Sequence, residues 1–141
     1  MLDILSLENR NRIIVADDNE MVRDVVRAII EHGLSADCTS ASNLDEAIEI
    51  ASNSQVDLAL LDYNMPGMNG LNGLRRITSC NVRHIALFSG RISSDVIEEA
   101  IDLGVSGFLP KTLEPNAMLQ AIRAMCVGEK FPGQHFLGKL I

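Results

Sequence analysis

Short apolar runs alternate along the chain with longer stretches in which apolar residues recur every three to four positions. A continuous apolar run of about four residues is typical of a strand that is buried on both faces of a parallel sheet. Five such runs predict five strands, although the second is only weakly apolar. The predicted strands are residues 13–16, 37–41, 58–61, 85–88 and 108–109.

The longer stretches predict five helices, one after each strand. Most of their starts are marked by residues that cap a helix or fit its first turn. These are Asn19, Asn43 with Glu46 as a capping-box pair, Ser93 or Ser94, and Pro115. A short helix over 71–77 completes the set, and Gly33 and Gly104 stop two of the others. Alternating strands and helices predict an α/β fold, a doubly wound parallel sheet with helices on both faces.

The size of the chain suits one domain. It has 141 residues, of which 47% are hydrophobic, enough to bury a core. We assign residues 12–128 to that domain, residues 1–11 to an N-terminal extension, and residues 129–141 to a C-terminal extension or the start of a linker.

The charge and the cysteine content narrow the range of functions and cellular locations that the chain can have. The net charge of −7 argues against a nucleic-acid-binding surface, which normally carries a basic patch. No apolar run is long enough to cross a bilayer, and residues 1–12 lack the pattern of a signal peptide. Cys38, Cys80 and Cys126 form an odd set without metal-site spacing, so we expect reduced thiols in a cytoplasmic protein.

Polar residues stand at the ends of four predicted strands. Asp17 and Asp18 follow the first strand, Asp62 the third, Ser89 the fourth and Lys111 the fifth. Parallel strands end at one edge of their sheet, so these side chains should gather there. Clustered carboxylates hold protons unless a cation neutralises them, and oxygen ligands suit Mg²⁺.

This set of groups is suited to phosphoryl transfer. A carboxylate can attack phosphorus once a divalent ion screens its charge, which gives an acyl phosphate. A lysine and a hydroxyl can then bind the phosphoryl oxygens. Each residue alone is more commonly a helix cap, a turn residue or a solvated surface group. Their joint placement at four strand ends is what favours a functional site.

The pattern resembles the receiver domain of two-component response regulators, over roughly residues 12–128. The resemblance implies a (βα)5 flavodoxin-like receiver fold with strand order 2-1-3-4-5. It also implies a switch that accepts a phosphoryl group from a histidine kinase onto Asp62. The most specific motif is the stretch from Asp62 to Gly70. The motifs that carry the resemblance are residues 15–19, 60–70, 88–90 and 107–111.

The resemblance assigns a metal site for Mg²⁺ or Mn²⁺. Asp62 matches the phospho-acceptor and a metal ligand, and Asp18 matches the direct metal ligand. Asp17 matches the acid that acts through water, and Asn64 the residue whose backbone carbonyl completes the site. These roles follow from the family alone.

The resemblance also assigns the groups that respond to phosphorylation. Ser89 matches the hydroxyl residue that follows the phosphoryl group, and Lys111 the lysine that pairs with its oxygens. Phe108 matches the aromatic switch position, although a plain core phenylalanine is an equal alternative. Thr112 departs from the proline that often follows the lysine, and Pro110 precedes the lysine instead.

The tail over residues 125–132 looks like the end of receivers in the LuxR/NarL group of transcription regulators. We therefore expect the receiver part of a longer regulator, with a stand-alone receiver as the alternative. The expected partners are a sensor histidine kinase or phosphotransfer protein, and a second copy of the chain as a homodimer. DNA would be bound only through a C-terminal output domain, and no membrane is expected.

The resemblance implies that the chain is not a dedicated enzyme, although it would catalyse its own phosphorylation and dephosphorylation. Three other functions stay open at this point. A phosphatase of the haloacid-dehalogenase type needs a second aspartate two residues after the first, where this chain has Asn64. A mononucleotide-binding domain needs a glycine-rich loop after the first strand, which is missing. The third is a receiver that works without phosphorylation, as a protein-interaction module.

Overall fold

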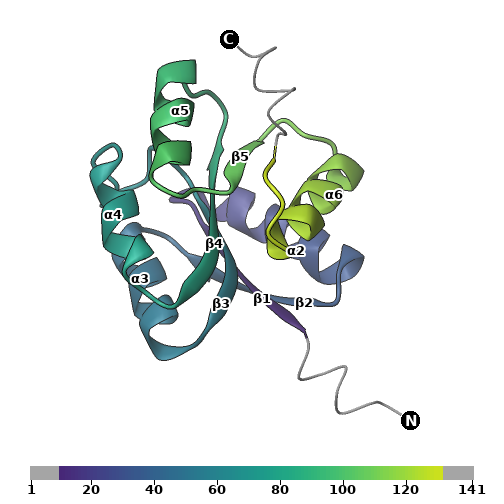
Figure 1. Cartoon of the computed structure of the whole chain (residues 1–141). Helices are drawn as coiled ribbons and strands as arrows, with labels where there is room; N and C mark the ends of the chain where they lie inside the picture. Colours follow the sequence, from purple (N-terminus) through teal and green to yellow (C-terminus); the bar gives the residue numbers. More distant parts are fainter. Residues whose placement is uncertain (1–9, 132–141) are drawn as a thin grey trace.

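The computed structural model describes residues 10–131, which form five parallel strands alternating with five helices (Figure 1). The elements are β1 (Asn11–Ala16), α2 (Glu20–Gly33), β2 (Ala36–Ala41), α3 (Leu44–Asn53), β3 (Val56–Leu61), α4 (Asn72–Thr78), β4 (Val82–Ser89), α5 (Ser94–Asp102), β5 (Gly107–Pro110) and α6 (Pro115–Cys126). Most of the predicted extensions lies outside the described residues, so the domain boundaries stay a prediction.

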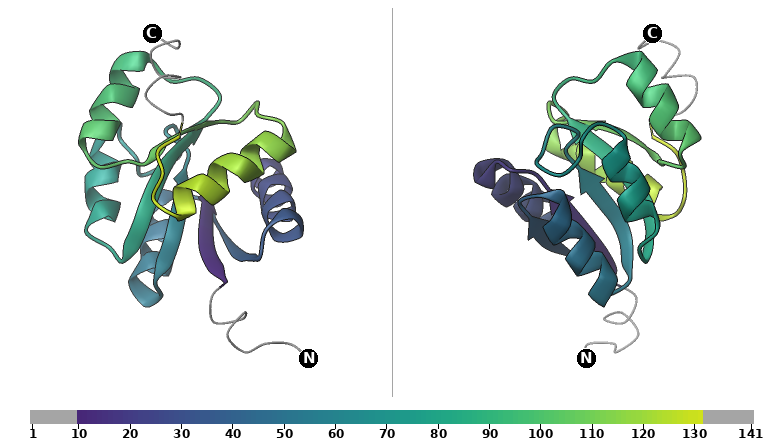
Figure 2. Two further views of the ribbon diagram at one scale, coloured as in Figure 1. Left: turned by 45° about the vertical axis from the view of Figure 1, so that its right-hand side comes forward. Right: turned by 90° about the vertical axis from the view of Figure 1, so that its left-hand side faces the viewer.

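The strands form one sheet in the order β2-β1-β3-β4-β5, which confirms the predicted fold and strand order. Helices cover both faces of the sheet (Figure 2). The buried side chains of α2 and α6 join one apolar cluster, and those of α3, α4 and α5 join another. The sheet, with the predicted site residues at the ends of its strands, therefore lies between two separate apolar cores.

The buried stretches of the central strands are apolar because each contributes to both cores. Leu58 and Leu60 of β3 face the α2 and α6 side, while Ala59 and Leu61 face the other side. Alternate residues of a strand point to opposite faces, so a strand covered on both sides needs an unbroken apolar run. This explains why the runs predicted strands correctly.

Three helices begin at the predicted caps. Asn19 Oδ1 accepts from the Val22 amide at 3.2 Å, and Ser93 Oγ accepts from the Val96 amide at 3.3 Å, so Ser93 and not Ser94 is the cap. Asn43 caps α3 by accepting from the Glu46 amide at 2.8 Å. The second hydrogen bond of the predicted capping box differs, because the Glu46 carboxylate accepts from the Ser42 amide instead of the Asn43 amide.

All five strands begin one to three residues before their predicted apolar runs. β3 starts at Val56 and β4 at Val82, and these two residues pair in the ladder between the strands. Backbone pairing thus extends past the buried stretch, where polar side chains such as His84 interrupt the apolar pattern. Among the helices of residues 10–131, none is long and apolar enough to cross a membrane.

The three cysteine thiols are free, and we expect them to differ in reactivity. Burial, followed by the nearby charge of Glu31, raises the pKa of Cys38 to about 12, and burial raises that of Cys126 to about 11. Because the thiolate is the reactive form, iodoacetamide at about pH 8 should modify the half-buried Cys80 first. Cys38 should react on the order of a thousandfold more slowly than an ordinary thiol, and faster as the pH rises. Peptide mass mapping in native buffer and in urea measures this; equal rates for Cys38 in both would contradict it.

Candidate functional site

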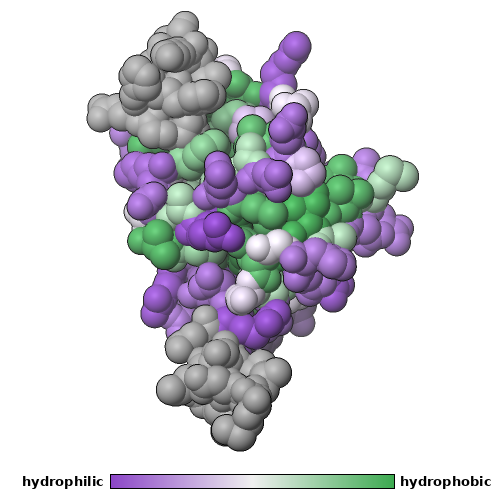
Figure 3. Space-filling view, turned by 90° about the vertical axis from the view of Figure 1, so that its right-hand side faces the viewer, coloured by the Kyte–Doolittle hydropathy of each residue, from purple (hydrophilic) through white to green (hydrophobic). Residues whose placement is uncertain are grey.

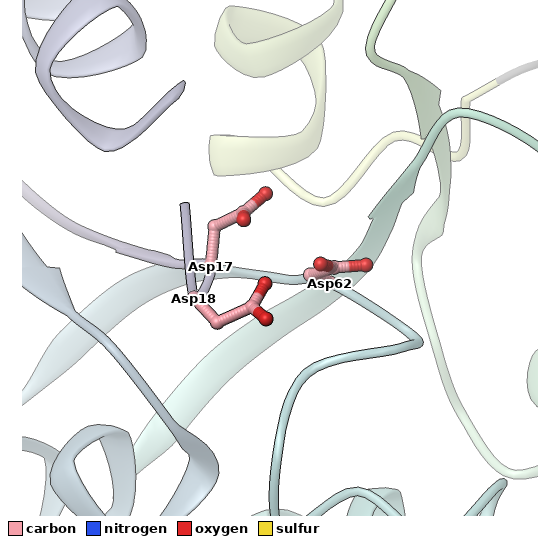
Figure 4. Close-up of side chains that lie close together, drawn as sticks. All are labelled: Asp17, Asp18 and Asp62. Carbon is pink, nitrogen blue, oxygen red and sulfur yellow. The ribbon is translucent and has the colours of Figure 1, made fainter. Parts of the chain in front are cut away.

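Three carboxylates meet at the carboxyl edge of the sheet (Figure 4). Asp17 and Asp18 directly follow β1, and Asp62 directly follows β3, the neighbouring strand. The Asp62 amide donates to the Ala16 carbonyl at 3.0 Å, which continues the strand pairing into the site. One oxygen from each carboxylate lies within 4.8 Å of the others. This oxygen-only cluster fits a hard divalent cation, as the sequence predicted.

Backbone amides fix the two buried carboxylates. The Asn19 amide donates to Asp17 Oδ1 at 2.8 Å, and the Asn64 amide donates to Asp62 Oδ1 at 3.0 Å. Asp17 is fully buried and Asp62 is 4% exposed, whereas Asp18 is exposed. Each buried carboxylate therefore keeps one oxygen on the backbone and turns the other toward the edge of the sheet.

Lys111 bridges these second oxygens. Its ammonium Nζ forms an ion pair with Asp17 Oδ2 and lies 3.3 Å from Asp62 Oδ2. The Lys111 amide donates to the Ser89 carbonyl at 3.0 Å, so β4 and β5 together set the position of the lysine. In this conformation the lysine supplies the positive charge that two buried carboxylates need.

Phe88 is a part of the site that the sequence did not predict. The Lys111 ammonium lies 5.4 Å from the centroid of the Phe88 ring, within reach of a cation–π interaction. In the sequence Phe88 is an ordinary apolar residue of the fourth strand. The only signal was its place directly before Ser89, in a strand that pairs with the one leading to Lys111.

The electrostatics of the site oppose a free Asp62 anion. Burial raises the pKa of Asp62, and the charge of Asp17 adds to this, against the Asn64 amide and Lys111, which lower it. Burial lowers the pKa of Lys111, but its contacts with Asp17 and Asp62 outweigh that effect and raise it overall. A divalent ion at the cluster would take over part of the neutralisation that Lys111 now provides.

The side chains of two predicted residues take no part in these contacts. Ser89 is buried, but its hydroxyl donates to the Arg91 carbonyl at 3.4 Å. The Phe108 side chain is 7% exposed and packs in the core beneath α3, α4 and α5. The structure thus brings Asp17, Asp18, Asp62 and Lys111 together, whereas within residues 10–131 no hydrogen bond joins the Ser89 hydroxyl to them. The roles of all these residues stay predictions.

The loop after Asp62 owes its sequence to close packing. Gly67 has φ +96°, and a side chain there would place its Cβ 2.9 Å from the Leu44 Cβ. The Leu44 amide donates to the Pro66 carbonyl at 3.0 Å, which ties the loop to the start of α3. Only glycine combines this conformation with this approach. Gly67, within the most specific motif of the sequence, thereby lets the loop that follows Asp62 pack against the start of α3.

Comparisons with known proteins agree with this geometry. Residues 13–123 match the family described as the response regulator receiver domain. The nitrate/nitrite response regulator protein NarL of Escherichia coli (strain K12) is 36% identical over 121 residues, covering 83% of this chain and 55% of NarL. The corresponding protein NarP is 36% identical over 123 residues, covering 84% and 56%. The chain thus spans about half the length of these curated relatives.

Solved structures show the same architecture. The signal receiver domain of the putative response regulator NarL from Mycobacterium tuberculosis has a TM-score of 0.76 at 26% identity, covering 85% of this chain and 98% of that one. A LuxR-family two-component response regulator from Aurantimonas has a TM-score of 0.80 at 25% identity, covering 94% and 96%.

Proposed function

Since the chain belongs to the response regulator receiver family, we propose that it is a phosphorylation-dependent switch whose phosphoryl acceptor is Asp62. A receiver of this kind is a signalling domain and not a dedicated enzyme. The single observation that supports Asp62 most strongly is its setting. It shares the acidic cluster and the Lys111 ammonium with Asp17, but it keeps 4% exposure where Asp17 has none, and the loop that it opens is tied to α3.

In the proposed reaction an oxygen of Asp62 attacks phosphorus. The new O–P bond forms as the bond from phosphorus to the donor breaks, and the donor leaves with the electron pair. The donor is a phosphohistidine of a sensor kinase or phosphotransfer protein. The chain supplies the nucleophile itself, so autophosphorylation from a small acyl phosphate follows the same course.

The cluster fits Mg²⁺ or Mn²⁺, because its ligand atoms are oxygens at the spacing of one ion. We assign Asp18, Asp62 and the backbone carbonyl of Asn64 as ligands, with Asp17 acting through water. When bound, the ion neutralises charge between the carboxylates and the incoming phosphoryl group. Asp17 and Asp62 are already oriented for this by the Asn19 and Asn64 amides.

Phosphorylation then rearranges Lys111, Ser89 and Phe108. Lys111 exchanges its contact with Asp17 for the phosphoryl oxygens, and Ser89 turns its hydroxyl from the Arg91 carbonyl toward them. Phe108 on β5 responds as the switch residue. These shifts change the surface formed by α5, β5 and α6, which is where a second copy of the chain or an output domain would bind.

The full-length setting is also a proposal. Because the relatives NarL and NarP extend well beyond the matched part, we place this chain at the receiver end of a regulator of that type, in the cytoplasm. DNA would then be bound by a separate C-terminal domain.

The test is phosphorylation by acetyl phosphate, followed by intact mass. With Mg²⁺ present, the protein should gain the mass of one phosphoryl group, and EDTA should suppress the gain. Asp18→Asn should need more Mg²⁺ for the same gain, because one ligand charge is lost. Glu98→Gln, an exposed acid on α5, serves as the matched control and should phosphorylate normally. No gain with either acetyl phosphate or a panel of histidine kinases would favour the non-phosphorylated interaction module.

A further inference from the structure

After α6 the chain turns back and joins the sheet. Phe131 forms a parallel bridge with Gly107 on the outer side of β5. The Phe131 amide donates to the Ser106 carbonyl at 3.0 Å, and the Phe108 amide donates to the Phe131 carbonyl at 2.8 Å. We call residues 129–131 the strap; Figure 1 shows it in yellow, running beside β5. The strap thus occupies an edge that would otherwise expose backbone groups.

The end of α6 is built to direct the strap there. The Gly128 amide donates to the Met125 carbonyl at 3.1 Å, and the Glu129 amide donates to the Ala124 carbonyl at 3.0 Å. Gly128 has φ +93°, so these bonds form the glycine-terminated turn known as the Schellman motif. This turn reverses the chain toward β5.

Gly107 is the residue of β5 that pairs with the strap. A Cβ at this position would lie 1.6 Å from the Phe131 carbonyl oxygen and 2.6 Å from its carbon. Gly107 has no positive φ, so its backbone conformation does not demand glycine. The close approach of the strap is what excludes a side chain. The Phe131 ring also packs against the core beneath α2 and α6.

The strap contacts the strand that leads to the acceptor site. β5 lies between β4, which ends at Ser89, and the strap, which bonds to Phe108. Lys111 follows β5 directly and holds Asp17 and Asp62 in the present conformation. The pairing of Lys111 with both carboxylates therefore coexists with a strap that is bonded to β5.

We propose that the strap and Asp62 are coupled through β5, so that phosphorylation of Asp62 loosens the strap. This rests on the proposed function, because the input is the phosphoryl group. In the proposed switch Lys111 exchanges Asp17 for the phosphoryl oxygens, and we expect the accompanying shift of β5 to strain its bonds to Phe131. The strap then carries the signal out of the domain, since Phe131 leads into the remainder of the chain. Coupling is reciprocal, so a loosened strap should favour the phosphorylated conformation.

Amide hydrogen exchange tests the forward direction. In the full chain treated with acetyl phosphate and Mg²⁺, the Phe108 and Phe131 amides should exchange several-fold faster than in untreated protein. Intact mass of the same samples reports phosphoryl occupancy. A mass gain with unchanged exchange at both amides overturns the coupling and leaves the proposed function standing. The absence of a mass gain with acetyl phosphate and with the panel of histidine kinases overturns both.

Strap variants test the reverse direction. Gly107→Ala forces the strap away, and Phe131→Pro removes the amide that bonds to Ser106. The probe is beryllofluoride, an unreactive mimic of the phosphoryl group. With Mg²⁺ present, both variants should bind it at least about 5-fold more tightly than the wild type. Val127→Ala, an exposed neighbour, is the matched control and should bind as the wild type does. Phe131→Pro lies beyond the last helix, so it decides the matter if Gly107→Ala does not fold. Unchanged or weaker binding by Phe131→Pro would overturn the proposal.

Discussion

Replacing Asp62 with alanine should abolish phosphorylation by acetyl phosphate while leaving the domain folded. The side chain provides the attacking oxygen, and the other carboxylates of the cluster are placed differently. Asp17 is fully buried, whereas Asp62 keeps 4% exposure, and Asp18 is exposed and forms no ion pair with Lys111 within residues 10–131. Intact mass after incubation with acetyl phosphate and Mg²⁺ measures the effect, and the expected gain is zero.

The same variant should be slightly more stable than the wild type in EDTA. Burial raises the pKa of Asp62, which means that folding disfavours its charged form at neutral pH. Removing that carboxylate leaves Lys111 paired with Asp17 alone. Asp102→Ala, which removes an exposed acid at the end of α5, controls for the loss of a charge and should change neither property. Persistence of the phosphoryl mass in Asp62→Ala would show that another residue is the acceptor.

Replacing Leu60 with alanine should cause the largest loss of stability of the changes considered. Leu60 is fully buried on β3, between Val15 of β1 and Ala86 of β4. Truncating a buried leucine typically costs about 2–5 kcal/mol, because apolar contacts are lost and a cavity remains. That is a large part of the roughly 5–15 kcal/mol that holds a domain folded.

Urea denaturation followed by circular dichroism measures this loss as a lower midpoint with an unchanged slope. Met21→Ala is the matched control, because Met21 is 75% exposed and its truncation should change stability by no more than about 0.5 kcal/mol. A loss of less than about 1 kcal/mol for Leu60→Ala would mean that the core re-forms around the missing side chain.

The gathering of the site residues at one edge of the sheet was predictable because it follows from a rule of topology. Once 13–16 and 58–61 were recognised as parallel strands, the edge location of Asp17 and Asp62 followed without any knowledge of contacts. The fine contacts were not predictable in this way. The Ser89 hydroxyl bonds to Arg91, and the Phe88 ring lies beneath Lys111, because of side-chain conformations that a pattern does not encode.

The strap escaped prediction for a different reason. A bridge that consists of one residue, Phe131, has no periodicity, so the sequence favoured an extension or a linker there. Gly107 gave no warning either, because a glycine before a short strand is an ordinary turn residue. Its meaning depends on a segment more than twenty positions away in the sequence, which only the folded chain brings beside it.

The close approach of Phe131 to Gly107 also affects how copies of this chain can meet. An open strand edge is a template on which another polypeptide can pair, and repeated pairing leads to aggregation. By bonding Ser106 and Phe108 to itself, the chain closes its β5 border at that point. Of the two outermost strands in residues 10–131, β2 is then the border that no such bridge covers. The absence of a side chain at position 107 thus helps to keep neighbouring molecules from pairing edge to edge through β5.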